Sequence, residues 1–219
     1  MTYDNFAGIR RAALRLTAVM LIALSGACSL GPQIREQPAG YDLGPLKSYP
    51  RENPGIAVAL LVPDISAPAW LDNQGIVYRL NYQDATQPRV YANSRWAASP
   101  ALLMSQRVRN RFAAATSGIV TTGSGARADY ALRIDLEDFS QAFDAENRSR
   151  VSIRARASLV NIAARTLVAQ RTFTLERPAA PNAEGAVKAL GEAGDAMIDS
   201  LLAWTEQSLK GAKRTASGK

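Results

Sequence analysis

The 219-residue chain contains no histidine, one cysteine and five lysines. Histidine is the commonest general base and metal ligand in enzymes, so its absence removes the usual catalytic and metal-binding arrangements. A single thiol cannot form an intrachain disulfide, and none of the five lysines stands beside a serine in a recognisable catalytic motif. These absences predict that the protein is not an enzyme and that it binds neither a metal ion nor a cofactor.

Two carboxylates nevertheless stand at a spacing that some enzymes use. Asp135 and Glu137 share one face of a predicted strand, where they lie roughly 6–7 Å apart, as in a paired-carboxylate glycosidase. The alternative is that they form cross-strand ion pairs, which stabilise neighbouring strands. The arginines available for such pairs are Arg154, Arg156 and Arg171. We favour ion pairing over catalysis.

One glycine-rich segment matches a nucleotide-binding pattern. The sequence GSGARA, residues 123–128, fits the G-x-G-x-x-A fingerprint of dinucleotide-binding proteins. That fingerprint needs a helix directly after it, because the helix N-terminus holds the phosphates. The residues that follow alternate with a period of two and predict a strand instead. We therefore interpret 123–128 as a loop.

The formal net charge of +7 is concentrated at the two ends of the chain. Residues 1–27 contribute +2, and the C-terminal stretch contributes +4 through Lys210, Lys213, Arg214 and Lys219. Residues 28–209 are therefore nearly neutral, with a net charge of +1. This balance does not indicate the clustered basic surface that binds nucleic acid, so we expect no nucleic-acid partner. We predict that residues 210–219 form a disordered basic tail.

The first 27 residues have the three parts of a secretory signal peptide. A leader with three arginines is followed by the uncharged run 16–27, which ends in small residues. As a helix this run spans only about 18 Å, whereas a bilayer core of about 30 Å needs about 20 residues. A buried amphipathic helix fits less well, because the run is apolar on every side. We predict that residues 1–27 are a signal peptide.

The only cysteine, Cys28, follows this run directly. The residues before it, LSGA at 24–27, resemble a bacterial lipobox, although the leucine stands four rather than three positions ahead of the cysteine. The resemblance implies that Cys28 becomes the mature N-terminus, with a diacylglycerol on its sulfur and a fatty acid on its amine. More than one such chain anchors a protein stably to a membrane. The alternative is an inert buried cysteine. Ser29 in the next position implies release to the outer membrane.

Residues 28–40 have little apolar content and two prolines, so we predict a flexible tether behind the lipidated cysteine. The pattern from 41 to 209 is that of one globular domain. Apolar runs predict strands over 56–62, 76–82, 89–98, 118–123, 130–139, 151–160 and 166–175. Helices are predicted over 100–116, after Ser99 as N-cap, and over a long C-terminal stretch from 182. These elements predict an α+β fold, a two-layer sandwich of a mostly antiparallel sheet with two helices packed on one face.

Four segments of this domain occur in an order that resembles the ABC-type transport auxiliary lipoproteins. They are YDLGP at 41–45, IAVALLVPDI at 56–65, PAWLDNQGIVYRLNYQ at 68–83 and YANSRWAASPALLMSQRVRNRF at 91–112. One departure is Ala98-Ser99, where family members often carry an acidic residue. The resemblance implies a periplasmic domain tied to the outer membrane. Its partners would be an MCE-domain protein and ABC transporter subunits that move phospholipids or other hydrophobic molecules between membranes, and it would carry no catalytic residues.

Aromatic residues on loops are frequent binding anchors. Trp70 and Leu71 stand in the predicted loop 64–75, and Trp96 stands close to the start of the helix predicted from residue 100. We predict these three residues as contacts for a transporter partner. The alternative is that Trp70 and Trp96 fill the end of the sandwich.

Two other functions are compatible with a lipid-anchored domain of this size. The first is regulation or assembly of another envelope system, such as peptidoglycan synthesis, where small α+β domains on tethers also serve. The second is an anchored hydrolase, which the lack of histidine disfavours.

Overall fold

The computed structural model describes residues 37–50 and 55–217. The predicted signal peptide, Cys28 and most of the predicted tether therefore lie outside the described residues. Among the described residues, no helix is both long enough and apolar enough to span a bilayer.

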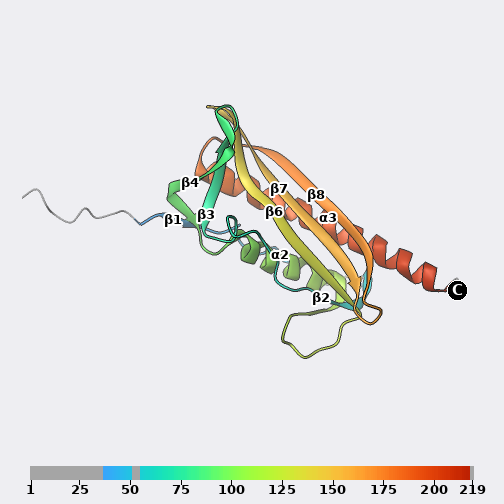
Figure 1. Ribbon diagram of the computed structural model, residues 1–219. Coiled ribbons are helices and arrows are strands. Elements are labelled where there is room, and N and C mark those ends of the chain that lie inside the picture. The colour runs from blue at the N-terminus through green and yellow to red at the C-terminus, as the bar shows by residue number, and fades with distance from the viewer. Residues whose placement is uncertain (1–36, 51–54, 218–219) are drawn as a thin grey trace, which may run out of the picture. The chain divides into compact units, whose positions relative to one another are not determined.

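The described residues form one sheet of eight strands and two helices (Figure 1). The strands are β1 (Ala39–Tyr41), β2 (Ile56–Leu61), β3 (Gly75–Leu80), β4 (Asp84–Trp96), β5 (Thr116–Val120), β6 (Tyr130–Ala145), β7 (Arg148–Asn161) and β8 (Thr166–Ala179). The helices are α2 (Pro100–Ala115) and α3 (Ala183–Ser217). The first strand, β1, falls at the end of the segment that the sequence predicted as a tether.

Strand β6 is the centre of the sheet. Along one edge it pairs antiparallel with β7, which pairs antiparallel with β8. Along its other edge β2, an isolated bridge at Ser66 and then β3 follow one another, all parallel to β6. The chain from 56 to 80 thus pairs with β6 in three separate places. The loop 67–74 connects the bridge at Ser66 to β3. The sheet continues from β2 to β5 and from β3 through β4 to β1.

The sheet is mixed, so the prediction of a mostly antiparallel sheet is wrong. Four of the seven strand pairings are parallel, namely β1 with β4, β2 with β5, β2 with β6 and β3 with β6. Alternation along a strand shows which face is buried, but it does not show the direction of the neighbouring strand. The predicted β7–β8 hairpin is confirmed.

The core lies between one face of the sheet and the two helices, which confirms the α+β class and the layer of helices. Buried side chains of β6 and β7 meet buried side chains of α2 and α3 there. The main contributors are Ile134, Leu136, Ala155 and Ala157 from the sheet, Met104, Val108 and Phe112 from α2, and Met197, Ile198 and Leu201 from α3. Each fully buried large apolar side chain contributes about 1.5–3 kcal/mol to stability. Helix α2 ends within one residue of its predicted range.

Helix α3 continues through 210–217, where the sequence predicted a disordered tail. Leu209 is buried, and Lys210 forms an ion pair at 2.6 Å with Glu206 one turn earlier. Such i,i+4 pairs stabilise a helix, and the cations near its C-terminus interact favourably with the helix dipole. The predicted disorder is therefore wrong for 210–217.

A buried polar network fixes the end of the sheet where β3 and β4 join. The side chain of Gln141 on β6 donates to Ser149 Oγ at 2.7 Å and to the Ala180 carbonyl at 2.9 Å. Its oxygen accepts a hydrogen bond from the Tyr91 hydroxyl at 2.6 Å. Burial raises the pKa of Tyr91 to about 12, so this hydroxyl remains a donor at neutral pH. The network ties β4 to β6, β7 and the segment that leads into α3.

Candidate functional site

The segment directly after β1, residues 42–49, crosses the two helices and is called here the strap. It starts with a tight turn, in which the Gly44 amide donates to Asp42 Oδ1 at 2.7 Å. Gly44 has φ of 84°, a left-handed conformation that glycine adopts without strain. The side chain of Leu43 is buried in the core. The turn points the carbonyls of Leu43 and Gly44 toward α2.

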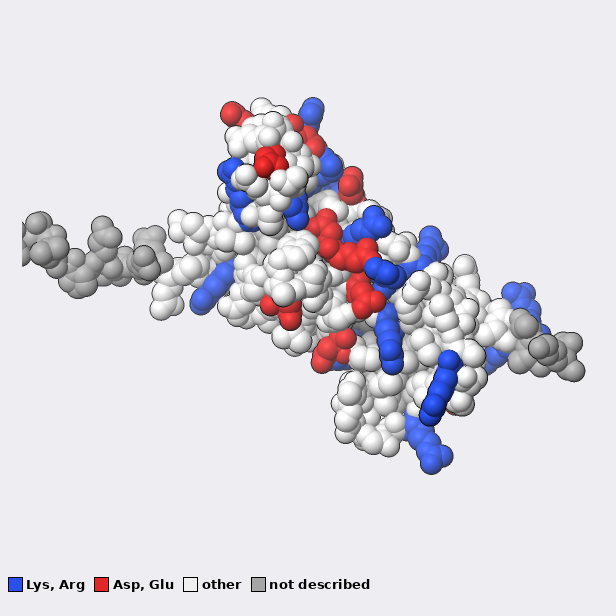
Figure 2. Space-filling view, viewed as in Figure 1, with Lys and Arg blue, Asp and Glu red and all other residues white. Residues whose placement is uncertain are grey.

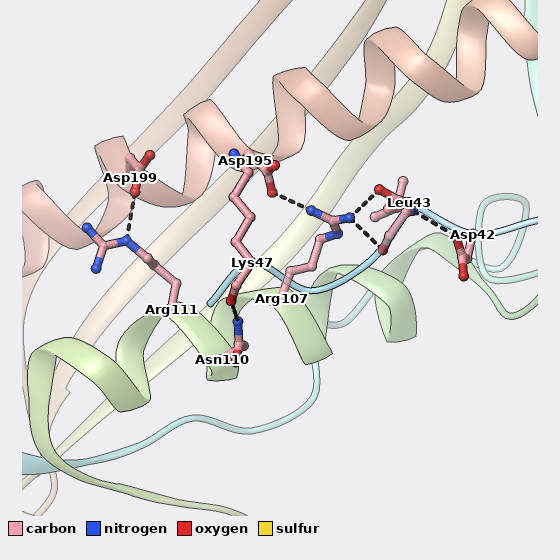
Figure 3. Close-up of polar contacts among 9 residues, drawn as sticks. Asp42, Leu43, Lys47, Arg107, Asn110, Arg111, Asp195 and Asp199 are labelled. Atoms are coloured by element: carbon pink, nitrogen blue, oxygen red, sulfur yellow. Dashed lines mark hydrogen bonds and ion pairs between the residues drawn. The ribbon is translucent and has the colours of Figure 1, made fainter. Parts of the chain in front are cut away.

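Arg107, in the middle of α2, receives these carbonyls (Figure 3). Its Nη2 donates to the carbonyls of Leu43 and of Gly44, the latter at 2.9 Å. Its Nη1 lies 2.5 Å from Asp195 Oδ1 on α3. Only 6% of Arg107 is exposed. A buried charge is tolerated when it is paired and hydrogen-bonded, and these contacts satisfy that condition.

Further contacts hold the strap along its length. Lys47 Nζ lies 2.9 Å from Asp195 Oδ2, and this hydrogen bond raises the pKa of Lys47. The Lys47 carbonyl accepts a bond at 2.8 Å from the side-chain amide of Asn110 on α2. The guanidinium of Arg111 lies 4.6 Å from the centre of the Tyr49 ring and pairs with Asp199 Oδ1 at 2.8 Å.

The two arginine–aspartate pairs also position the helices. Arg107 and Arg111 are one turn apart on α2, and Asp195 and Asp199 are one turn apart on α3. Because the pairs occur in the same order along both helices, α2 and α3 lie side by side and run in the same direction. Gly191 lets α3 approach the strap, since a Cβ there would lie 3.2 Å from the Leu43 carbonyl oxygen. We call Arg107, Arg111, Asp195 and Asp199 the strap clamp.

An open groove of about 700 Å³ lies beside the strap clamp. It is lined by residues of β1 and the strap, by Ala97 and Arg107, and by Val187, Lys188, Gly191, Glu192 and Asp195 of α3. Every charged group of the strap clamp is engaged by an opposite charge. The arrangement therefore suits the attachment of a chain segment rather than proton transfer.

The structure separates the three residues predicted as partner contacts. Leu71 and Trp96 are buried in the core, and the Trp96 ring packs against Phe139 with ring centres 5.7 Å apart. Trp96 therefore packs inside the sandwich, as the alternative had it, whereas Trp70 does not. Trp70 is 40% exposed, and the Arg79 guanidinium lies 5.4 Å from the centre of its ring. Of the three, only Trp70 presents its side chain at the surface, and its contact with a partner stays a prediction.

The carboxylates of β6 are engaged in hydrogen bonds and ion pairs. Glu137 pairs with Arg154 at 2.8 Å and with Arg156, and Asp135 accepts a hydrogen bond from the Ser66 hydroxyl. Hydrogen bonds from Arg154 and then Arg156 lower the pKa of Glu137. The acid of a glycosidase needs a raised pKa, so this environment opposes that role.

The predicted cross-strand pairing is thus confirmed for Arg154 and Arg156 and wrong for Arg171. Arg171 stands opposite Ala157 in the β7–β8 register, and Ala157 points into the core. Its guanidinium lies 5.1 Å from the centre of the Phe173 ring. Arg171 is therefore on the helix face of the sheet, and Glu137 is on the other face.

The remaining predictions about the site concern the glycine-rich loop, metal ions and charge. Residues 123–128 lie in the loop between β5 and β6 and lead into a strand, as interpreted. Among residues 37–50 and 55–217, histidine, cysteine and acidic side chains form no group suited to a metal ion. On the face seen in Figure 2, acidic and basic side chains are mixed over the upper and middle parts, and separate basic side chains lie toward the C-terminal end.

A family model for ABC-type transport auxiliary lipoprotein components matches residues 41–201. The chain belongs to this family. The match begins at Tyr41, so the strap is the first part of the auxiliary lipoprotein domain. No curated protein matches the chain.

Two solved structures share the fold. Protein XCC0632 from Xanthomonas campestris is 22% identical with a TM-score of 0.70, and the match covers 80% of this chain and 99% of that one. An uncharacterized protein is 19% identical with a TM-score of 0.60, and the match covers 78% of this chain and 99% of that one. At these identities the likeness shows the fold of the auxiliary lipoprotein domain.

Replacing Arg107 with methionine is expected to lower the free energy of unfolding by about 3 kcal/mol, because it leaves the Leu43 and Gly44 carbonyls without their donor and Asp195 with only the exposed Lys47. Urea denaturation measures the change, and limited proteolysis reports whether the strap becomes accessible. Lys47→Met is the matched control, since this exposed cation pairs with the same aspartate and is worth at most about 1 kcal/mol. Equal stability of the two variants would show that the strap clamp does not hold the strap.

Replacing Glu137 with glutamine is expected to make stability less sensitive to acid. The pKa of Glu137 is lowered in the folded protein, so its contribution is present above the unfolded value near 4.5. That contribution is lost as the pH falls through the lowered pKa. The wild type should exceed the variant by up to about 1 kcal/mol at pH 7. Thermal unfolding from pH 7 to pH 3 measures the gap, and a gap that widens in acid contradicts this assignment.

Proposed function

We propose that this auxiliary lipoprotein serves an MCE-type ABC transport system that moves phospholipids or other hydrophobic molecules between membranes. It is held on the periplasmic side of the outer membrane by lipids on Cys28. It acts as a non-catalytic subunit, and its partners are the MCE-domain protein and the ABC transporter subunits. The observation that carries this proposal is the family match over residues 41–201 behind a lipobox-like sequence.

The attachment of the strap supports an anchored role. Ala39, the first residue of β1, stands eleven positions after Cys28, and an extended chain of that length reaches at most about 40 Å. Strand β1 and the strap clamp then fasten this segment to the sheet and to both helices. A membrane anchor at Cys28 therefore keeps the domain close to the bilayer without leaving a long loose end.

The ion pairs formed by three carboxylates support a non-catalytic role. Glu137, the carboxylate with the strongest claim to catalysis from its spacing, is held by two arginines with a lowered pKa. Asp195 and Asp199 are engaged by arginines of α2. Catalytic acids and bases need pKa values close to the working pH, whereas the hydrogen bonds from Arg154 and Arg156 lower the pKa of Glu137.

Replacing Cys28 with serine is expected to abolish lipidation and release the protein from the membrane. Intact-mass spectrometry of the wild-type mature chain should find residue 28 at the N-terminus, carrying a diacylglycerol and a fatty acid. Density-gradient fractionation should place the wild type with the outer membrane and Cys28→Ser in the soluble fraction. An unmodified Cys28 in the mature wild-type chain would refute the anchoring.

The transport partner is tested by cross-linking in intact cells, followed by purification of the wild-type protein. Recovery of an MCE-domain protein with ABC subunits is expected, and Cys28→Ser is expected to recover at least tenfold less. Recovery of a peptidoglycan synthase without transporter subunits would instead favour a role in the regulation or assembly of peptidoglycan synthesis. Neither outcome depends on the identity of the transported molecule.

A further inference from the structure

Trp70 and Val90 form an exposed apolar patch on the β3–β4 hairpin and the loop before it. They are 40% and 56% exposed. Asn73 links them, because its side-chain amide donates to the Trp70 carbonyl and its oxygen accepts the Gly75 amide, both at 2.7 Å. A Cβ on Gly75 would lie 2.8 Å from Val90 Cγ1, so glycine is needed for Val90 to pack there. We call Trp70, Val90, Arg79 and Arg95 the Trp70 patch.

Two arginines flank the apolar pair. Arg79 lies over the Trp70 ring and donates to the Ala85 carbonyl at 3.1 Å. Arg95 is exposed and stands opposite Gly75 in the β3–β4 register. Within the described part of the chain, neither guanidinium forms an ion pair. The acid of this loop, Asp72, is exposed. Both arginines are therefore available to an anionic group.

The Trp70 patch lies beside the point where the tether enters the domain. Gly40 of β1 pairs with Arg95 of β4, which pairs with Gly75 of β3. Three neighbouring strands place Gly40 and Gly75 about 10 Å apart. The tether from Cys28 to β1 reaches at most about 40 Å when extended. The patch is therefore within reach of the bilayer that would hold the lipids of Cys28.

The chemistry of the patch suits a bilayer surface better than a protein. A tryptophan ring is stable at the boundary between lipid and water, and arginine pairs with headgroup phosphates while its stem stays in apolar surroundings. The surface of two apolar side chains is far smaller than the roughly 800 Å² that each partner buries in a stable protein interface. An anchored domain needs little more, because the anchor keeps it at a high effective concentration near the surface.

We propose that the Trp70 patch rests on the surface of the membrane to which the protein is anchored, with Trp70 at the level of the headgroups and Arg79 and Arg95 on lipid phosphates. This inference rests on the proposed anchoring at Cys28. It goes beyond that anchoring, since it assigns the face of the domain that meets the lipid.

Tryptophan fluorescence tests the proposal directly. Trp96 and Trp204 are buried, so Trp70 is the exposed tryptophan of the described residues. The lipidated mature protein is reconstituted into vesicles of phosphatidylethanolamine and phosphatidylglycerol, with or without brominated acyl chains. Brominated lipid is expected to quench the wild type and to leave Trp70→Phe unchanged. Absence of quenching in the lipidated wild type would overturn the proposal.

Matched variants test whether the patch, rather than the anchor alone, holds Trp70 at the lipid. Val90→Asp is expected to reduce the quenching at least twofold. Leu167→Asp is the control, because Leu167 is 59% exposed and lies far from the patch. Leu167 pairs with Val160, which pairs with Ala131 of β6. Ala131 lies about 33 Å along β6 from Gln141, the residue beside Tyr78 of β3. Equal quenching in the two variants would contradict the proposal.

Two further readouts separate the alternatives. The first is the same quenching measured after purified transporter subunits are added to the vesicles. Loss of quenching on their addition would show that Trp70 binds a protein in the assembled system, and it would overturn the lipid assignment. The intact mass of the same sample shows whether Cys28 carries lipid. A lipidated protein without quenching refutes only the role of the patch, whereas an unmodified Cys28 refutes the proposed anchoring and this inference with it.

Discussion

The buried guanidinium of Arg107 is the constraint on which the arrangement of strap and helices depends. A charge removed from water must regain an opposite charge and hydrogen-bond acceptors. Asp195 supplies the charge, and the Leu43 and Gly44 carbonyls supply the acceptors. These carbonyls face α2 because Gly44 adopts a left-handed conformation that its neighbours would resist. The strap, α2 and α3 therefore depend on one another, since loss of the strap leaves Arg107 without its two carbonyl acceptors and loss of α3 leaves it without its opposite charge. This explains in physical terms the YDLGP segment at which the family match begins.

Local features of the sequence were sufficient for much of the fold. Helix α2 begins at Pro100 as predicted, because proline at the first helical position and an apolar stripe are both properties of the segment itself. Strand direction is not such a property. Strands β2 and β3 both run parallel to β6, because the chain leaves that edge through the loop 67–74 and returns to it. The alternation of apolar and polar residues within a strand is the same whichever way the neighbouring strand runs. The prediction of antiparallel pairing was therefore correct only for strands joined as hairpins.

The candidate site was predictable in its charges but not in its backbone contacts. Arg107 and Arg111 on α2 match Asp195 and Asp199 on α3 at the same i,i+4 spacing. The sequence shows this match of charges, but the spacing fits either relative direction of the two helices. The other partners of Arg107 are backbone carbonyls. Every residue has a backbone carbonyl, so no sequence pattern predicts which ones Arg107 contacts. Trp70 and Leu71 are adjacent, yet one is exposed and the other buried. A loop has no periodicity by which the sequence could separate them.

Strands β3 and β4, which carry most of the Trp70 patch, and the C-terminal end of α3 lie at opposite ends of the domain (Figure 1). Gln141, beside β3, hydrogen-bonds the carbonyl of Ala180, so α3 starts at the patch end. Its 35 residues carry it about 52 Å away. A tether alone sets the distance of a domain from the bilayer and leaves it free to rotate. A second contact two strands from the tether, such as the proposed contact of the Trp70 patch with lipid, removes that freedom. Trp70 cannot serve lipid and transporter at once, and its place beside the tether favours lipid.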